Sequence, residues 1–65
     1  MKNRVRELRK SGGWTQEQFG ELLEVSRQTI NSIENGRFDP SLTLALKIAG
    51  LLENPVEEIF FLPED

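Results

Sequence analysis

The sequence predicts an all-α fold, a compact bundle of five short helices, for three reasons. Apolar residues recur three or four positions apart in several short segments, as they do along one face of an α-helix. Three of these segments follow a Ser or Thr residue, the residue types that cap helix N-termini. No segment carries a strand signal. Because the chain has only 65 residues, we expect one domain over residues 1–65 with a single small core.

The first helix is predicted over about Asn3–Lys10. Met1, Val5 and Leu8 recur there at the spacing of one helix face. The Ser-Gly-Gly sequence at 11–13 ends the helix, because Gly readily adopts the left-handed conformation of a helix exit. Two consecutive glycines also predict an unusually loose first turn.

The second helix is predicted to begin after Thr15. Thr15 and Gln18 have the spacing of a capping box, in which each side chain bonds the other residue's main-chain N–H. The residues expected to face inward are Phe19, Leu22 and Leu23.

The third helix is predicted to follow Ser26 as its cap, with Ile30 and Ile33 facing inward. Its remaining positions are polar: Arg27, Gln28, Asn31, Ser32 and Asn35. A helix with this many polar residues keeps one broad face outside the core.

The last two helices complete the bundle. Pro40 restricts the residue before it, and Ser41 caps the fourth helix, which is apolar on more than one face and therefore central. The apolar residues that spread over these faces are Leu42, Leu44, Ala45, Ile48, Ala49, Leu51 and Leu52. Pro55 opens the fifth helix, since it lacks only an N–H that would be unpaired there anyway. Val56, Ile59 and Phe60 follow.

The composition argues against an enzyme. The chain contains no Cys and no His, which excludes disulfides, zinc sites of the usual kind, thiol nucleophiles and imidazole bases. Glu57 and Glu58 are adjacent, so on a helix they point in different directions and do not form a catalytic or magnesium-binding pair. We expect no metal and no cofactor.

The net charge of -3 is unevenly distributed. Residues 1–40 carry seven basic and six acidic residues, for a net charge of +1, whereas residues 41–65 carry one basic and five acidic residues, for -4. The longest apolar run, Ile59–Leu62, is far shorter than the roughly 20 residues of a membrane span. Without a signal segment or a membrane span, the sequence predicts a cytoplasmic protein with no membrane partner.

Two of the predicted helices, joined by a tight turn, carry a distinctive set of residues. The set comprises Thr15-Gln16, Val25-Ser26-Arg27-Gln28-Thr29-Ile30 and Ile33-Glu34-Asn35-Gly36. In these residues the chain resembles the Cro and phage-repressor (XRE) type helix-turn-helix family of transcription regulators, over about Arg4 to Phe60. The resemblance implies a lambda-repressor-like DNA-binding domain.

The third helix has the chemistry to read bases. The major groove admits one α-helix, and Arg matches guanine while Gln or Asn matches adenine. One turn of helix separates two pairs of polar residues that can face one groove: Arg27, Gln28, Asn31 and Ser32. We call these four the base-reading set. The alternative is that an exposed helix of a bundle simply carries polar residues.

The resemblance also implies contacts with DNA phosphates. They would come from Gln16 at a helix start, from Asn35 and Arg37, and from the capped start of the fourth helix near Ser41. Arg9 matches a family position whose side chain forms an ion pair with the acid at Glu34 and is also directed toward a DNA phosphate. An ordinary structural salt bridge is its alternative role.

The chain departs from the family pattern at several positions. Glu24 stands where a turn glycine is usual, and a left-handed backbone there costs about 1 kcal/mol. Gly20 replaces a small Ala at a loss of helix propensity of about 1 kcal/mol. Trp14 replaces an aliphatic residue, and 53–55 replace a glycine-containing turn, so the packing of the fifth helix is the least secure expectation.

The C-terminal segment 56–65 predicts a homodimer. Phe60 can close the core, but Phe61 and Leu62 then have no place left to bury, and adjacent exposed apolar residues on a small protein usually mark an interface. We expect Phe61 and Leu62, with part of Leu51–Leu52, to meet their symmetry copies. The alternative is a tail folded back over its own core.

Together these features predict a sequence-specific regulator of transcription that binds double-stranded DNA. The expected mode is repression through a palindromic operator bound by the homodimer. Control would come from concentration, from dimerisation or from a regulatory protein partner. The alternative is a protein-interaction module on the same fold, of the antitoxin or anti-repressor type. Such a module would carry aromatic and aliphatic anchors on the third helix.

Overall fold

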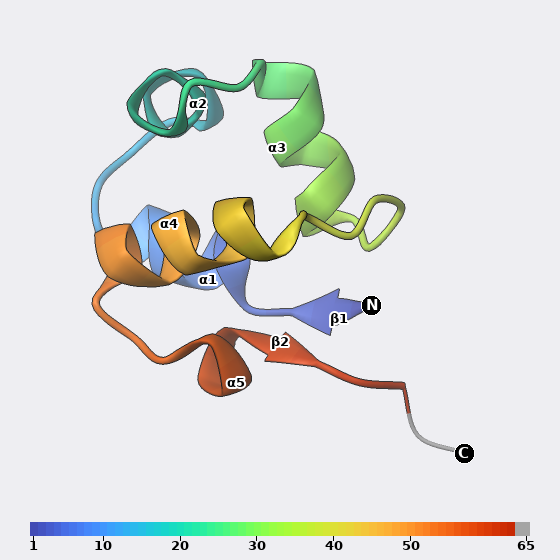
Figure 1. The fold of residues 1–65 in the computed structure, drawn as a ribbon. Helices are drawn as coiled ribbons and strands as arrows, with labels where there is room; N and C mark the ends of the chain where they lie inside the picture. Colours follow the sequence, from blue (N-terminus) through green and yellow to red (C-terminus); the bar gives the residue numbers. More distant parts are fainter. Residues whose placement is uncertain (64–65) are drawn as a thin grey trace.

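Five helices and two short strands make up the computed structural model, which describes residues 1–63 (Figure 1). In chain order they are β1 (Lys2–Asn3), α1 (Val5–Ser11), α2 (Gln16–Leu23), α3 (Arg27–Glu34), α4 (Leu42–Leu52), α5 (Val56–Ile59) and β2 (Phe60–Phe61). The predicted bundle of five short helices is therefore confirmed. Within the described residues, no helix has the length and apolar character needed to cross a membrane.

The core lies where α4 packs against the other helices. Its buried apolar residues are Val5, Phe19, Leu23, Ile30, Ile33, Ala45, Ile48, Ala49, Ile59 and Phe60. The prediction for Leu22 was wrong, because its side chain is 56% exposed. The inward face of α2 instead consists of Phe19, Gly20 and Leu23, which share one side of the helix at 3.6 residues per turn.

The two strands form an antiparallel pair that the sequence did not predict. Lys2 pairs with Phe61 and Asn3 with Phe60, so segments from opposite ends of the described chain lie side by side (Figure 1). Arg4 N–H donates to the Ile59 carbonyl at 2.8 Å and extends this contact. Strands of two residues are too short to show a period-two pattern, which explains why the sequence carried no signal.

The first helix starts slightly later than the position of about Asn3 predicted from the sequence. Asn3 belongs to β1, and α1 begins two residues later. Its side-chain Oδ1 accepts a hydrogen bond from the N–H of Val5 at 3.0 Å, which satisfies a main-chain donor at the start of α1. Its Nδ2 donates to the carbonyl of Ile33 at 2.8 Å. Asn3 therefore connects the start of α1 to the end of α3.

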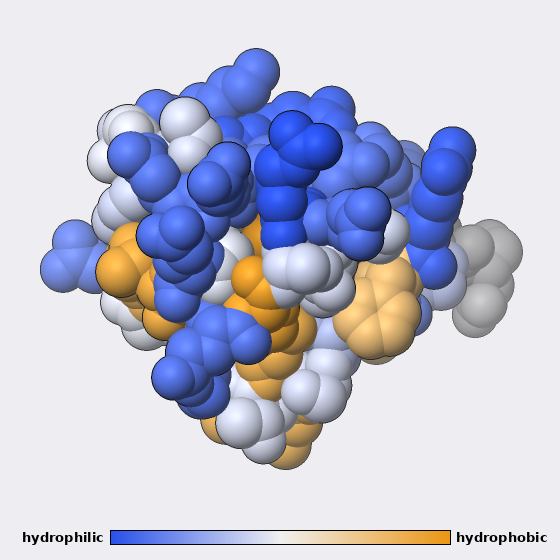
Figure 2. All heavy atoms as spheres, turned by 90° about the horizontal axis from the view of Figure 1, so that it is seen from above, coloured by the Kyte–Doolittle hydropathy of each residue, from blue (hydrophilic) through white to orange (hydrophobic). Residues whose placement is uncertain are grey.

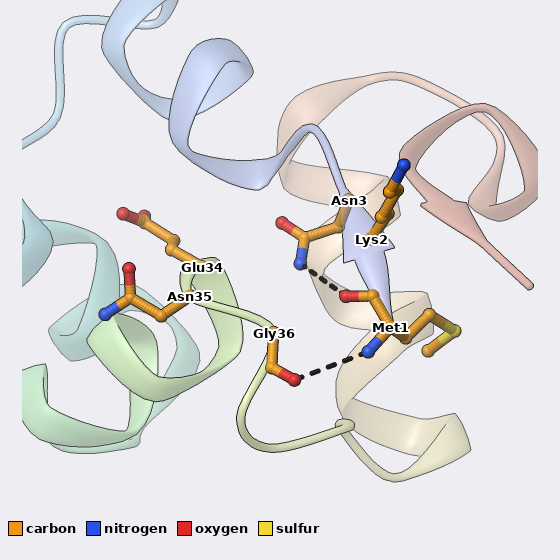
Figure 3. A pocket seen from close by; sticks show the side chains of 6 residues that line it. All are labelled: Met1, Lys2, Asn3, Glu34, Asn35 and Gly36. Atoms are coloured by element: carbon orange, nitrogen blue, oxygen red, sulfur yellow. Dashed lines mark hydrogen bonds between the residues drawn. The ribbon is translucent and has the colours of Figure 1, made fainter. Parts of the chain in front are cut away.

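The turn after α3 lies against β1 (Figure 3). The nitrogen of Met1 donates to the Gly36 carbonyl at 3.4 Å, and Asn3 Nδ2 lies 3.4 Å from the Met1 carbonyl. Gly36 has φ of 74°, in the left-handed region that glycine tolerates best. These contacts hold the exit of α3 close to the start of the chain.

The predicted helix caps are confirmed. Thr15 and Gln18 form both hydrogen bonds of the capping box. Ser26 accepts from the N–H of Thr29, and Ser41 accepts from the N–H of Leu44. Pro55 lies at the cap position of α5, one residue before the helix proper.

The turn between α2 and α3 combines two departures from the family pattern. Glu24 has φ of 61°, as expected for a left-handed residue in this position. The turn brings the Val25 carbonyl close to α2, where a Cβ at position 20 would lie 2.7 Å from its oxygen. Gly20 is therefore required by close packing, and Ala would force the turn to shift.

The glycine pair before α2 has a similar reason. A Cβ on Gly12 would lie 2.4 Å from the Trp14 ring, so Gly12 leaves room for that ring to pack. Gly13 has φ of 84°. Trp14 in turn contacts Phe19, with ring centroids 5.6 Å apart. A bulky aromatic ring therefore fills the space beside Gly12 in the turn that was expected to be loose.

We predict that relieving the left-handed glutamates stabilises the fold. Glu24 and Glu53 (φ 56°) both end a helix in the left-handed region, so Glu24→Gly and Glu53→Gly should each raise the free energy of unfolding by about 0.5–1 kcal/mol. Urea denaturation measures the change. Glu21→Gly is the matched control, and it should lower the free energy of unfolding by about 1 kcal/mol, because Glu21 is exposed within α2. Equal destabilisation by all three changes would contradict the account.

Candidate nucleic-acid interface

The base-reading set lies on one accessible face around the start of α3. Arg27, Gln28 and Asn31 are exposed, and Ser32 is half-buried. All four line a single hollow together with Gln16 from α2. The local cause is the Ser26 cap, which starts α3 so that Ile30 and Ile33 enter the core and the polar residues remain outside. Their contact with bases stays a prediction.

The residues expected to bind phosphate lie at helix ends. Gln16 is the first residue of α2, Asn35 is the C-cap of α3, and Ser41 caps α4. Arg37 is exposed in the turn between α3 and α4, and its N–H donates to the Ser32 carbonyl at 3.0 Å. This bond folds the turn back onto α3. The phosphate contacts themselves stay predictions.

Arg9 and Glu34 form a buried ion pair. Arg9 Nε lies 2.6 Å from Glu34 Oε2, and Arg9 Nη2 lies 3.2 Å from Oε1. The side chains of Arg9 and Glu34 are 7% and 0% exposed. Arg9 Nη1 also donates to the Trp14 carbonyl at 2.8 Å. Of the two roles considered for Arg9, the structure has the salt bridge, and little of the side chain remains accessible to a phosphate.

The pKa of Glu34 reflects two opposing effects. Burial alone would raise it, because a buried carboxylate loses its hydration. Hydrogen bonds from Arg9 and Gln16, with the charge of Arg9, outweigh burial and hold the pKa of Glu34 below its usual range. Glu34 is therefore ionised at neutral pH and acts only as a hydrogen-bond acceptor.

The ion pair continues outward to residues of the predicted interface. Gln16 Nε2 donates to Glu34 Oε1 at 3.1 Å and to Asn31 Oδ1 at 3.2 Å. Arg6, half exposed, donates to the same Glu34 oxygen at 3.3 Å and to Asn35 Oδ1 at 2.7 Å. Figure 3 shows the side chains of Glu34 and Asn35 pointing to the same side, away from β1.

Phe38 was not predicted from the sequence to be part of the interface. Its side chain is 49% exposed and lines a hollow with Ser26, Gln28, Thr29 and Ser32, beside the base-reading set. The sequence feature that could have indicated this residue is an aromatic side chain immediately after Arg37 in an otherwise polar turn. Arg6 was likewise not singled out, because its contact with α3 spans 28 residues of sequence.

The surface near α2 and the start of α3 is mostly polar. Seen from above, where these helices lie, hydrophilic side chains cover the upper half of the view and apolar ones show mainly in the lower half (Figure 2). No group of His, Cys, Asp or Glu able to hold a metal occurs among residues 1–63. Besides hydrogen-bonding side chains, this face offers the exposed guanidinium groups of Arg27 and Arg37 and the ring of Phe38.

The predicted dimer residues have different environments. Phe61 is 39% exposed and Leu62 is 85% exposed, whereas Leu51 and Leu52 are half-buried. Ile59 and Phe60 fill the core as expected. Phe61 also pairs with Lys2 in the sheet, so this part of the segment does fold back on the chain. Glu64 and Asp65, the last residues of the predicted segment 56–65, lie outside the described residues.

Two further apolar residues are exposed on α4. Leu42 is 73% exposed and Leu46 is 55% exposed, one helical turn apart. Leu42 was expected to contribute to an apolar face of this helix, and Leu46 was not singled out from the sequence. They form a second accessible apolar surface.

The family model for helix-turn-helix proteins matches residues 5–59. The chain is 48% identical to the HTH-type transcriptional regulator YgzD of Bacillus subtilis, over 100% of this chain and 98% of that protein. It is 36% identical to the competence pilus inhibition repressor of Acinetobacter baylyi, over 94% of this chain and 56% of that protein.

Among solved structures, the fold is similar to the restriction-modification controller protein C.AhdI of Aeromonas hydrophila. The TM-score is 0.77 at 35% sequence identity, and the match covers 88% of this chain and 83% of that chain. The shared part includes most of the helices described above.

We predict that Glu34 makes a large contribution to acid unfolding. Its folded pKa is depressed, so its contribution to stability is present above its unfolded pKa of about 4.3 and is lost as pH falls through the folded value. The double variant Arg9→Met/Glu34→Leu removes the titrating carboxylate without leaving an unpaired buried charge. It should therefore flatten the dependence of unfolding free energy on pH in that range, by up to about 1.4 kcal/mol per pH unit. Urea denaturation from pH 7 to pH 3 measures these slopes.

Glu7→Gln is the control for that measurement. Arg4 also holds the pKa of Glu7 below its usual range, through a hydrogen bond and its charge, but this pair is exposed at the surface. Exposed pairs contribute little to stability. The slope should change less in Glu7→Gln than in Arg9→Met/Glu34→Leu, and equal changes in slope would contradict the role assigned to burial.

Proposed function

Because the chain belongs to the helix-turn-helix family of transcriptional regulators, we propose that it represses transcription by binding a palindromic operator as a homodimer. The family match covers residues 5–59, and DNA binding is the shared property of that family. The membership expected from the sequence is confirmed. The operator, the homodimer and repression are the parts proposed here.

The observation that carries the proposal is the shared face of the base-reading set. Its side chains are those that match base edges, and they line one hollow at the start of α3. None of these four side chains belongs to the buried apolar core. A protein-interaction module on this fold is less well supported, because the face of α3 offers polar groups where a protein partner would need apolar anchors.

The surrounding residues support positioning on the DNA backbone. Arg37 supplies an exposed charge, and Arg6 holds Asn35 Oδ1, so that Nδ2 of Asn35 is the group left to donate to a phosphate. Phe38 lies beside Gln28, where an aromatic side chain suits contact with a thymine methyl group.

Repression is the mode that suits a single DNA-binding domain. Occupation of a promoter requires only binding, and one relative is named as a repressor. Control then comes from concentration, from dimerisation or from a regulatory protein partner. The site of action would be the cytoplasm, where bacterial and archaeal DNA is found.

The homodimer is supported by exposed apolar residues near the end of the described chain. Phe61 and Leu62 remain accessible although the core is complete. A two-fold axis would place two α3 helices about 34 Å apart on one side of the DNA and explain a palindromic operator.

We predict different effects for two exposed arginines. Arg27→Ala should weaken binding to the preferred site by about 1–3 kcal/mol and relax the preference at one base pair. Arg37→Ala should lower affinity for all sequences alike and flatten the dependence of log affinity on log salt by about one unit. Binding assays on the preferred site and on random duplexes at several salt concentrations measure both effects. Unchanged base preference in both Arg27→Ala and Gln28→Ala would refute α3 as the reading helix.

We predict that Phe61→Glu converts the homodimer to a monomer, because a charge in the interface loses its hydration. Sedimentation at micromolar concentration measures the state of association. Leu46→Glu is the control, since Leu46 is exposed on α4 outside the predicted interface, and this variant should remain a dimer. A wild-type monomer would contradict the proposal. A dimer that only Leu46→Glu dissociates would assign the interface to α4.

A further inference from the structure

Gln16 carries two hydrogen bonds that the proposed function does not require. Both start from its Nε2 atom, which donates to Glu34 Oε1 at 3.1 Å and to Asn31 Oδ1 at 3.2 Å. An amide nitrogen has two hydrogens, so these bonds use its full donor capacity. Gln16 comes from α2, whereas both acceptors belong to α3.

The direction of these bonds follows from the buried ion pair. Glu34 is ionised, so both of its carboxylate oxygens can only accept hydrogen bonds. Arg9 donates to both oxygens, and any other neighbour must also donate to them. The atom of Gln16 that faces Glu34 must therefore be Nε2. Since the same atom faces Asn31, the Asn31 atom that meets it must be Oδ1.

The orientation of Gln16 determines what Asn31 offers to the outside. Asn31 is exposed, and its Oδ1 faces Gln16. Because the amide is planar, its Nδ2 points in a different direction from Oδ1. Among residues 1–63, Asn31 Nδ2 forms no hydrogen bond. Asn31 also lines the hollow shared by the base-reading set. This face therefore presents a hydrogen-bond donor at the position of Asn31.

We propose that Gln16 is a positioning residue that fixes Asn31 as a donor, so that Asn31 selects a base-edge acceptor and rejects cytosine. The proposal rests on the proposed function, because it concerns base reading by α3. Guanine, adenine and thymine each present an acceptor in the major groove, whereas cytosine presents the N4 donor. A freely rotating Asn amide would turn its oxygen toward cytosine N4 and lose this selectivity.

The proposal changes the role predicted for Gln16. Its side-chain N–H groups are both used within the protein, so its side chain has only the acceptor Oε1 left, which cannot bind a phosphate. A phosphate contact by this residue would come from its main-chain N–H at the start of α2. Gln16 then acts on DNA through Asn31.

The first test uses DNA-free protein and does not depend on the proposed function. Hydrogen exchange of side-chain amide protons, measured by NMR, should be slower for Gln16 than for Gln18, which lies on the same helix. Gln18 uses its Oε1 in the capping box, and its Nε2 forms no hydrogen bond within the described residues. Equal exchange rates at Gln16 and Gln18 would overturn the proposal.

The second test selects bound sequences from random duplex DNA. Wild-type protein should disfavour cytosine about 5- to 100-fold at one base position. Asn31→Asp identifies that position, because a carboxylate only accepts, and it should reverse the preference to cytosine. Gln16→Ala should abolish the discrimination at the same position and keep it elsewhere. Glu17→Ala is the matched control on the same turn of α2, and it should keep every base preference.

The outcomes separate the two proposals. Unchanged base preferences in Gln16→Ala would overturn the positioning role while DNA reading by α3 still holds. A wild-type protein that enriches no sequence would overturn the proposed function, and base selection by Asn31 with it, whatever the exchange rates of the free protein. Circular dichroism of each variant establishes that it is folded before selection.

Discussion

The buried ion pair between Arg9 and Glu34 is the contact on which the rest of the structure depends. It joins α1 to α3, and Arg9 also bonds the Trp14 carbonyl before α2. Removing one member of such a pair leaves an unpaired buried charge, which costs about 3–5 kcal/mol. A domain of this size is stable by only a few kcal/mol. The same pair orients Gln16 and, through it, Asn31, so stability and the polarity of the outer face have a common origin.

The turn between α2 and α3 shows how an unusual sequence keeps a tight helix pair. A left-handed Glu24 carries backbone strain, yet the turn it forms brings the Val25 carbonyl within 2.7 Å of where a Cβ at position 20 would be. Gly20 therefore lies where the turn packs closely against α2. Gly20, the glycine that this close contact requires, is buried, whereas the strained residue Glu24 is exposed to solvent.

Much of the fold followed from local chemistry. The helix caps and the inward positions of Ile30 and Ile33 were predictable because each depends on residues within one or two turns. The strand pair was not, since two-residue strands have no pattern. Leu22 was misplaced because Gly20 occupies the inner face of α2. At the interface, the polar residues of α3 were evident, but the bond from Gln16 to Asn31 was not, because residue types do not show which amide atom faces which.

In this account the ion pair sets the hydrogen-bond polarity of the face that we propose reads DNA. The most direct measurement is base selection by the double variant Arg9→Met/Glu34→Leu, because apolar residues of similar size can replace a buried pair without unfolding a protein. In this variant Gln16 loses its acceptor at Glu34. The account predicts a folded protein that still selects DNA but no longer discriminates against cytosine at the position of Asn31. Base preferences identical to those of the wild type would contradict it.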